Sequence, residues 1–372
     1  MPTNDQVMQA LATVNDPDVG RPITELGMVR EVTVDGGVVD VHVLLTVPGC
    51  PMRDRIEREV TAAVQPLEGV TQVRVALSAM TEQQRGEFAA KVRGNAPSAG
   101  PGGQVVIPFA QMDSQTKVLA IASGKGGVGK SSITTNLAVA LAQQGHSVGI
   151  LDADIWGYSI PRMMGVQGRP VAFENMVMPL QGHGCKVISI GFFIDTERPV
   201  IWRGPMLHRA LQQFLADVHW GDLDFLLCDL PPGTGDIAIS LAQMLPNADM
   251  LVVTTPQQAA QRVALRAGQT TAQTGMRVAG VIENMATFIA PDTGKEYRIF
   301  GEGGGILLAE ELDTTLLASI PIDPRLREGA DAGVPLVVSD PDAPASQRII
   351  DVANQLAASK RSLVGKSLPL KF

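Results

Sequence analysis

Cysteine is scarce in this 372-residue chain, and its scarcity excludes two classes of protein. The three thiols, Cys50, Cys185 and Cys228, are an odd number and lie far apart in the sequence. A disulfide-stabilised scaffold needs many paired cysteines, and a local zinc or redox motif needs two within a few residues. Neither pattern is present, so the fold must depend on a hydrophobic core.

Long apolar runs are also missing. No stretch of about 18 apolar residues occurs, so no transmembrane helix is predicted. The first residues, MPTNDQVMQALATVND, lack the basic and apolar segments of a secretory signal, and we expect a cytoplasmic protein. The last residues, SLVGKSLPLKF, are short and interrupted by Pro369, which does not favour a membrane-binding helix. We therefore expect no stable membrane association.

An excess of positive charge is absent as well. Thirty Lys and Arg residues against 38 Asp and Glu residues leave a net charge of −8, so we expect no nucleic-acid partner. The hydrophobic fraction, 45%, is that of a folded globular protein. Chains of this length usually divide their core, and we expect two domains.

The stretch GNAPSAGPGGQ has the composition of a flexible linker, which we place at residues 94–113. Before it, residues 1–93 are predicted to form a small α+β domain of αββαβ type. The expected elements are a helix over 4–15, strands over 29–34 and 38–47 around an Asp-Gly-Gly turn, a helix opening near Pro51, and a strand containing Val73, Val75 and Leu77.

Residues 114–372 show a different pattern, in which short apolar strands are followed by helices. The expected strands are 118–123, 148–151, 187–190, 225–228, 250–254, 278–282 and 316–320, with a helix over 132–144. Such alternation predicts a doubly wound α/β domain with seven or eight strands in a mostly parallel sheet.

The most informative segment is SGKGGVGKSS, residues 123–132. It satisfies the P-loop pattern directly after a predicted strand and before a predicted helix. Its glycines let successive N–H groups point at phosphate oxygens, and the helix start adds positive potential. We expect Lys130 to neutralise the β- and γ-phosphates and Ser131 to ligate Mg²⁺. The predicted nucleotide-binding residues are Gly124, Lys125, Gly126, Gly127, Val128, Gly129, Lys130, Ser131 and Ser132.

Acidic residues follow two of the predicted strands. Asp152 and Asp154 lie at the carboxyl edge of the sheet, where ligands of open α/β folds bind, and we expect them to orient the attacking water. Asp229 ends another apolar strand and is followed by LPPGTGD, which is typical of a Walker B motif. We expect Asp229 to assist the magnesium ion and Gly233 to move toward a γ-phosphate.

The string GKGGVGKSS resembles the deviant Walker A loop of the ParA, MinD and nitrogenase iron-protein ATPases. In those proteins the first lysine, here Lys125, crosses a dimer interface to the partner's nucleotide. The resemblance therefore implies an ATP-sandwich homodimer in which Lys125 and Lys130 take part in hydrolysis of Mg²⁺-bound ATP.

A longer series of motifs resembles the Mrp/ApbC-type iron-sulfur cluster carrier ATPases. GKGGVGKS, DADIWGYSIP, WRGPM, DLPPGTGD, VVTTPQ, VIENM and IFGEGGG occur in this order, over about residues 117–340. The segment LLTVPGCPMRD also resembles the small domain that precedes the ATPase in many bacterial members. The resemblance implies an ATPase that transfers clusters to apo iron-sulfur proteins, with Asn284 and Asp323 near the adenine.

One motif departs from that family. Its members typically read C-P-x-C-G after VIENM, giving two thiolates per subunit for a bridging [4Fe–4S] cluster, whereas this chain reads APDTG at 290–294. Alanine has no donor atom, and iron in such clusters is held by thiolate sulfur. Cys50, at a predicted helix start where the dipole favours a thiolate, is the remaining candidate ligand. An unreactive cysteine at that position is an equal alternative.

The sequence is therefore compatible with three functions. The first is a cluster carrier that binds a cluster through Cys50 or through a partner's ligands. The second is an ATP-gated adaptor that captures client proteins without a cluster. The third is a positioning ATPase of the MinD or ParA kind, which neither the −8 net charge nor the short tail favours.

Overall fold

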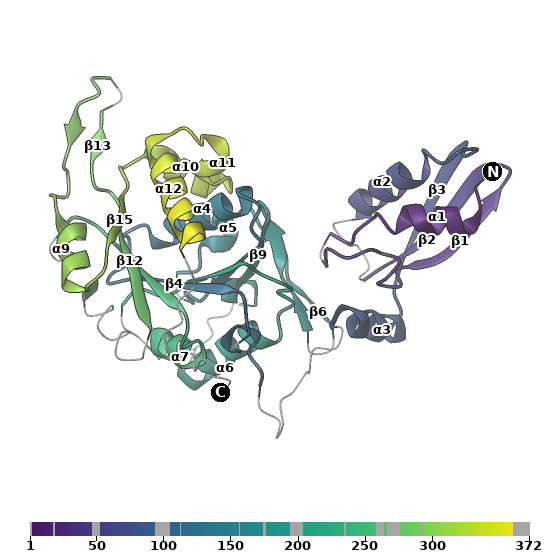
Figure 1. Cartoon of the computed structure of the whole chain (residues 1–372), viewed down its shortest axis with the longest axis horizontal. Helices are drawn as coiled ribbons and strands as arrows, with labels where there is room; N and C mark the ends of the chain where they lie inside the picture. Colours follow the sequence, from purple (N-terminus) through teal and green to yellow (C-terminus); the bar gives the residue numbers. More distant parts are fainter. Residues whose placement is uncertain are drawn as a thin grey trace, which may run out of the picture. The chain divides into compact units, whose positions relative to one another are not determined.

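The computed structural model describes residues 2–17, 19–46, 53–93, 105–111, 113–155, 157–173, 176–193, 204–233, 236–257, 264–265, 276–290 and 292–359. They form two compact units (Figure 1). The smaller unit consists of Met1–Ser98 together with Val171–Met178, and the larger of Ala99–Pro170 and Pro179–Phe372. Residues 94–104 of the predicted linker lie outside the described residues, so their flexibility stays a prediction. The predicted end of the linker at 113 is wrong, because Ile107 and Phe109 are buried and the ring of Phe109 packs against that of Trp220.

The smaller unit has the αββαβ order that the sequence predicts, followed by a third helix that the sequence analysis did not predict. Its elements are α1 (Asn4–Leu11), β1 (Val29–Asp35), β2 (Val38–Leu45), α2 (Arg53–Val64), β3 (Gln72–Ala79) and α3 (Glu82–Arg93). Strand β2 pairs antiparallel with β1 and parallel with β3. Helix α1 begins with a capping box at Thr3 but ends four residues before the predicted limit, because the Thr13 hydroxyl donates to the carbonyl of Ala10 and the chain turns.

Alternation along β2 directs one face of this small sheet into a core. Val39, Val41 and Val43 are buried there and pack with buried residues of the helices, among them Val7, Leu11, Ile56, Val60 and Phe88. A short hairpin from much later in the chain completes the unit. It consists of β6 (Val171–Phe173) and β7 (Met176–Met178), and the side chains of Met176 and Met178 join the same core.

The larger unit is built on an eight-stranded sheet with the order β15-β12-β11-β4-β10-β5-β9-β8. Its strands are β4 (Lys117–Ser123), β5 (Val148–Asp152), β8 (Leu180–Gly182), β9 (Cys185–Ser189), β10 (Phe225–Asp229), β11 (Asp249–Thr254), β12 (Arg277–Glu283) and β15 (Leu316–Ser319). Every pair is parallel except the edge pair β8–β9. The predicted doubly wound, mostly parallel sheet is confirmed.

Helices cover both faces of this sheet (Figure 1). Helices α4 (Lys130–Gln143), α5 (Ile160–Met163), α10 (Pro324–Ala332), α11 (Leu336–Ser339) and α12 (Pro344–Ala358) lie on one side, and α6 (Gly204–Ala216) and α7 (Asp236–Met244) on the other. Helix α9 (Gly304–Glu311) packs beside β12 and β15. No helix within the described ranges is both long and apolar enough to cross a bilayer.

Strand order fixes where a ligand can bind. After β4 the chain forms β5 and β9 on one side of β4 in the sheet. Strand β10 then inserts between β4 and β5, and β11 follows on the opposite side of β4. Such a reversal leaves a crevice at the carboxyl ends of the central strands. Register places Asp229 of β10 level with Ile121 of β4 and with Asp152 of β5. The two predicted acidic sites therefore meet at one edge, beside the P-loop.

Candidate nucleotide and magnesium site

The P-loop connects the end of β4 to the start of α4. Gly129 has φ +83° and immediately precedes the helix, a backbone conformation that glycine adopts without strain. A Cβ atom at this position would lie 2.2 Å from Nδ2 of Asn284, so space as well as conformation requires glycine. The loop therefore reaches the helix with its amides available to a ligand, as the motif predicts.

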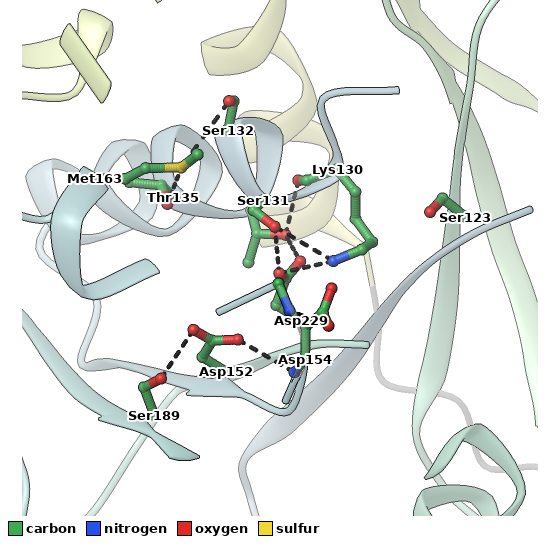
Figure 2. Close-up of polar contacts among 12 residues, drawn as sticks. Ser123, Lys130, Ser131, Ser132, Thr135, Asp152, Asp154, Met163, Ser189 and Asp229 are labelled. Carbon is green, nitrogen blue, oxygen red and sulfur yellow. Dashed lines mark hydrogen bonds and ion pairs between the residues drawn. The ribbon is translucent and has the colours of Figure 1, made fainter. Parts of the chain in front are cut away.

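Three side chains of α4 converge on Asp229 (Figure 2). Lys130 Nζ lies 2.7 Å from Asp229 Oδ2, and the Ser131 hydroxyl donates to the same oxygen over 2.6 Å. The Thr134 hydroxyl donates to Oδ1 over 2.7 Å. Lys130 and Ser131 were predicted to belong to the site with Asp229, whereas Thr134 was not. Its signal in the sequence is the spacing of four residues from Lys130, which is one helical turn.

The chemistry of these groups suits a magnesium-bound phosphate. Asp229 is completely buried and Lys130 is only 6% exposed, so the carboxylate and the ammonium compensate each other in a medium of low polarity. Hydroxyl and carboxylate oxygens are the ligands that Mg²⁺ prefers, and it usually keeps several waters besides. Ser131 and Asp229 would hold the ion, directly or through its waters, and Lys130 would then be released to the phosphates.

Asp152 lies beside Asp154 and positions it through a hydrogen bond to its backbone (Figure 2). Asp152 Oδ1 accepts the backbone N–H of Asp154 over 3.2 Å, and Oδ2 accepts the Ser189 hydroxyl over 2.9 Å. Burial, with a smaller contribution from the charge of Asp229, raises the pKa of Asp152 to about 7. Ser189, on the neighbouring strand β9, was not anticipated, because nothing in the sequence indicates that β9 lies beside β5.

Asp154 is slightly more exposed to solvent than Asp152, at 8% against 0%. Its Oδ1 accepts the backbone N–H of Gly157 over 3.0 Å, which fixes the chain directly after β5. The predicted roles of Asp152 and Asp154 in orienting water stay predictions. Ser132 is directed elsewhere, since its hydroxyl lies 4.0 Å from Sδ of Met163 in α5 (Figure 2).

Lys125 at the beginning of the P-loop is held by a residue of another loop. Its Nζ donates to Oε1 of Gln257 over 2.7 Å. The carbonyl of Lys125 accepts the Ser123 hydroxyl over 3.1 Å, and the N–H of Gly233 donates to the carbonyl of Ser123 over 2.8 Å. The loops after β4, β10 and β11 are thereby hydrogen-bonded to one another around the site.

Asn284 and Asp323, the residues predicted near the adenine, follow the adjacent strands β12 and β15. Asn284 is buried, and its Nδ2 donates to the carbonyl of Val128 over 2.9 Å. Asp323 caps α10 and forms an ion pair with Arg325 over 2.7 Å, which holds the pKa of Asp323 below its usual range despite partial burial. The structure brings Asn284 into contact with the P-loop, but Asp323 binds Arg325 instead.

The cysteines in the described ranges do not offer a cluster site. Cys185 and Cys228 are buried in the sheet, and burial raises the pKa of Cys185 to about 12 and that of Cys228 further. Ala290 and Thr293 lie at the turn between β13 (Phe288–Ile289) and β14 (Glu296–Tyr297), with no sulfur atom nearby in that hairpin. Within the described ranges no three His, Cys, Asp or Glu side chains cluster, and Cys50 lies outside those ranges.

A P-loop between a central parallel strand and a buried helix, with a carboxylate on the next strand, defines a P-loop nucleoside triphosphatase. Comparison with protein-family models narrows the class. Residues 114–357 match the family described as NUBPL iron-transfer P-loop NTPase, and residues 4–75 match the family described as iron-sulfur cluster assembly protein. The chain belongs to the iron-transfer P-loop NTPase family and is an ATPase.

Individual proteins agree with this assignment. The iron-sulfur cluster carrier protein of Mycobacterium tuberculosis (strain ATCC 25618 / H37Rv) is 53% identical over 374 residues, covering 99% of this chain and 96% of the relative. A nucleotide-binding protein from Archaeoglobus fulgidus, solved with ADP, is 38% identical with a TM-score of 0.52 and covers 58% of this chain and 86% of its own. The predicted resemblance to the cluster carrier ATPases is confirmed.

The positioning ATPases share the fold more distantly. The septum site-determining protein MinD of Pyrococcus horikoshii OT3, solved with Mg-ADP, is 25% identical with a TM-score of 0.51 and covers 65% of this chain and 96% of its own. The MinD structure covers 65% of this chain, whereas the cluster carrier protein of Mycobacterium tuberculosis covers 99% of it at higher identity. The comparisons therefore favour the carrier family over the positioning ATPases.

Proposed function

We propose that this chain is an ATP-hydrolysing iron-sulfur cluster carrier that acts as a homodimer and delivers clusters to apo client proteins. The observation that carries the proposal is the convergence of Lys130 and Ser131 on the buried Asp229, in a chain that is 53% identical to a protein named as a cluster carrier. That arrangement supplies the ATP and Mg²⁺ site, and the cluster is the cargo whose transfer ATP controls.

In the proposed hydrolysis, each residue acts on the bound nucleotide in a different way. Lys130 neutralises the β- and γ-phosphates, Ser131 and Asp229 hold Mg²⁺, and Asp154, positioned by Asp152, orients the attacking water. Lys125 leaves Gln257 and reaches the nucleotide of the partner subunit. The role of Lys125 is tested with a mixed dimer of Lys125→Ala and Lys130→Ala subunits. One of its two sites combines the intact Lys130 of one subunit with the intact Lys125 of the other, and turnover is expected to be restored at that site. The Lys125→Ala variant alone is expected to bind nucleotide but to hydrolyse it slowly.

The cargo site is proposed at Cys50 with a matching residue of the partner subunit or of a client. Support comes from the other thiols, because Cys185 and Cys228 are buried with raised pKa values and hold no exposed sulfur. Anaerobic reconstitution with iron and sulfide tests the assignment directly. Wild type is expected to bind iron and sulfide, Cys50→Ala to lose them, and the matched Cys185→Ala variant to retain them.

The burial of both described cysteines also favours a second candidate, an ATP-gated adaptor without a cluster. This candidate predicts that clients are captured in an ATP- and Lys130-dependent manner that iron does not affect. Equal and negligible iron binding by wild type and Cys50→Ala, together with such capture, would establish the adaptor and exclude the carrier. Either result leaves the ATPase assignment intact.

A further inference from the structure

The segment Thr254–Gln257, which begins at the last residue of β11, borders the beginning of the P-loop. Strand β11 lies directly beside β4, with Val253 in register with Ser123. The two strands are parallel, so the chain leaves both at the same edge of the sheet. The hydrogen bond from Lys125 to Gln257 over 2.7 Å shows that the two exiting segments stay in contact. This segment is therefore a side wall of the phosphate site.

Thr255 in this wall carries a buried hydroxyl that lacks a partner. Its side chain is 4% exposed, and its Oγ1 accepts and donates no hydrogen bond in the part of the chain that the structure describes. The preceding Thr254 is also buried, but its Oγ1 donates to the carbonyl of Thr255 over 3.4 Å. A buried hydroxyl without a partner loses its hydrogen bonds to water on folding and gains none in return, so proteins seldom keep one.

We propose that Thr255 is a further ligand-contacting residue of the nucleotide site, and that its hydroxyl donates a hydrogen bond to a phosphate oxygen of the bound nucleotide. Phosphate oxygens are strong acceptors, and a hydrogen bond to a charged acceptor is stronger than one to a neutral acceptor. The hydroxyl is thus unpaired in the free protein and paired in the complex. The inference rests on the nucleotide site alone and is independent of any cluster.

The test removes the hydroxyl while keeping the shape of the side chain. Thr255→Val is the isosteric variant, Thr255→Ala is a second variant without the hydroxyl, and Thr255→Ser retains it. Binding of Mg-ADP and of a non-hydrolysable Mg-ATP analogue to the full chain is measured by titration calorimetry, and the Tm of the ligand-free protein is measured beside it. Lys130→Ala, measured at a temperature below its own Tm so that it is folded, should lose binding altogether and shows whether the nucleotide site itself is assigned correctly.

Thr255→Val and Thr255→Ala are expected to weaken binding about tenfold, the effect of losing one hydrogen bond to a charged group, while Thr255→Ser stays within about threefold of wild type. The ligand-free Tm of Thr255→Val should equal or exceed that of wild type, because the unpaired hydroxyl is gone. Loss for the ATP analogue alone would place the contact on the γ-phosphate, and loss for both nucleotides would place it on the α- or β-phosphate.

Two results would overturn the proposal. One is unchanged affinity of Thr255→Val and Thr255→Ala for both nucleotides. The other is weakened binding together with a lowered ligand-free Tm in Thr255→Val, which would show that the threonine supports the packing of the wall rather than the ligand. If Lys130→Ala instead bound nucleotide normally, the P-loop assignment would fail, independently of Thr255.

Discussion

Asn284 holds the P-loop in place, because its Nδ2 donates to the carbonyl of Val128 over 2.9 Å. It follows β12, which lies on the other side of β4 from β10 in the strand order. A Cβ atom at position 129 would lie only 2.2 Å from the same nitrogen. The residue predicted to contact the adenine is therefore also a support of the phosphate-binding backbone, and a change at either end of this contact should reach the nucleotide.

Replacing Gly129 by alanine should separate this contact from ordinary backbone strain. Gly129→Ala introduces both a left-handed φ for a non-glycine residue and a collision with Asn284, whereas Gly145→Ala introduces the first alone, since φ is +91° there and no atom lies within 4 Å of its Cβ. Both variants should lose about 1–2 kcal/mol of stability from strain. Only Gly129→Ala should lose nucleotide affinity, measured by titration calorimetry. Equal affinity in the two variants would contradict the role of the contact.

The ion pair between Lys130 and Asp229 should be essential to folding as well as to binding. Lys130→Met leaves the buried carboxylate of Asp229 without a cation, at an expected cost of about 3–5 kcal/mol in urea denaturation of the nucleotide-free chain. The double variant Lys130→Met/Asp229→Asn removes both charges and should recover most of that stability without recovering nucleotide binding. A double variant no more stable than Lys130→Met would show that the two residues are not coupled.

Asp152 should make the stability of the nucleotide-free chain depend on pH. Its pKa is raised from 3.8 to about 7 in the folded protein, chiefly by burial, so the folded state retains a proton that the unfolded state releases. Stability should therefore fall as the pH rises from about 4 to 7, since folding then takes up a proton. In the Asp152→Asn variant, the free energy of unfolding from denaturation curves should differ less between pH 5 and pH 8 than it does in wild type. Compared with wild type, the variant should therefore be more stable at pH 8 than at pH 5. The exposed Asp292→Asn should leave the curve unchanged.

Thiol labelling should distinguish the cysteines. The pKa of about 12 for Cys185 leaves roughly one thiolate in ten thousand at pH 8, and burial blocks access as well. Cys185 and Cys228 should therefore resist iodoacetamide in the native chain and react after unfolding in urea, as peptide mass spectrometry would show. Cys50, if it is a ligand, should label rapidly and be protected after cluster reconstitution. Rapid native labelling of Cys185 would refute the proposed protection by burial.

The parts of the site that the sequence predicts are those encoded locally. The P-loop and the acids after β5 and β10 depend on short motifs next to apolar strands, and each is found at the expected strand end. Ser189 and Gln257 could not be predicted, because they reach Asp152 and Lys125 only through the order of strands in the sheet. Thr255 is similar: its motif was recognised, but a missing hydrogen-bond partner is visible only in three dimensions.

The fold shows the same division between local and distant information. Alternating valines predict β2, and the Asp-Gly-Gly turn predicts its hairpin with β1. The hairpin over 171–178 was not expected, because its methionines are buried in a core whose other members precede the linker. The limit of α1 was also misplaced, since the hydroxyl of Thr13 competes for a helix carbonyl.

The hairpin over 171–178 has a consequence for how the polypeptide is made. During synthesis, the first 98 residues emerge from the ribosome well before the segment that supplies Met176 and Met178 to their core. Until almost half of the chain has been translated, the smaller unit therefore lacks part of its core, and some of its apolar surface is uncovered. A fragment that ended within the linker would lack these two methionines, so no single cleavage divides the chain into two complete units.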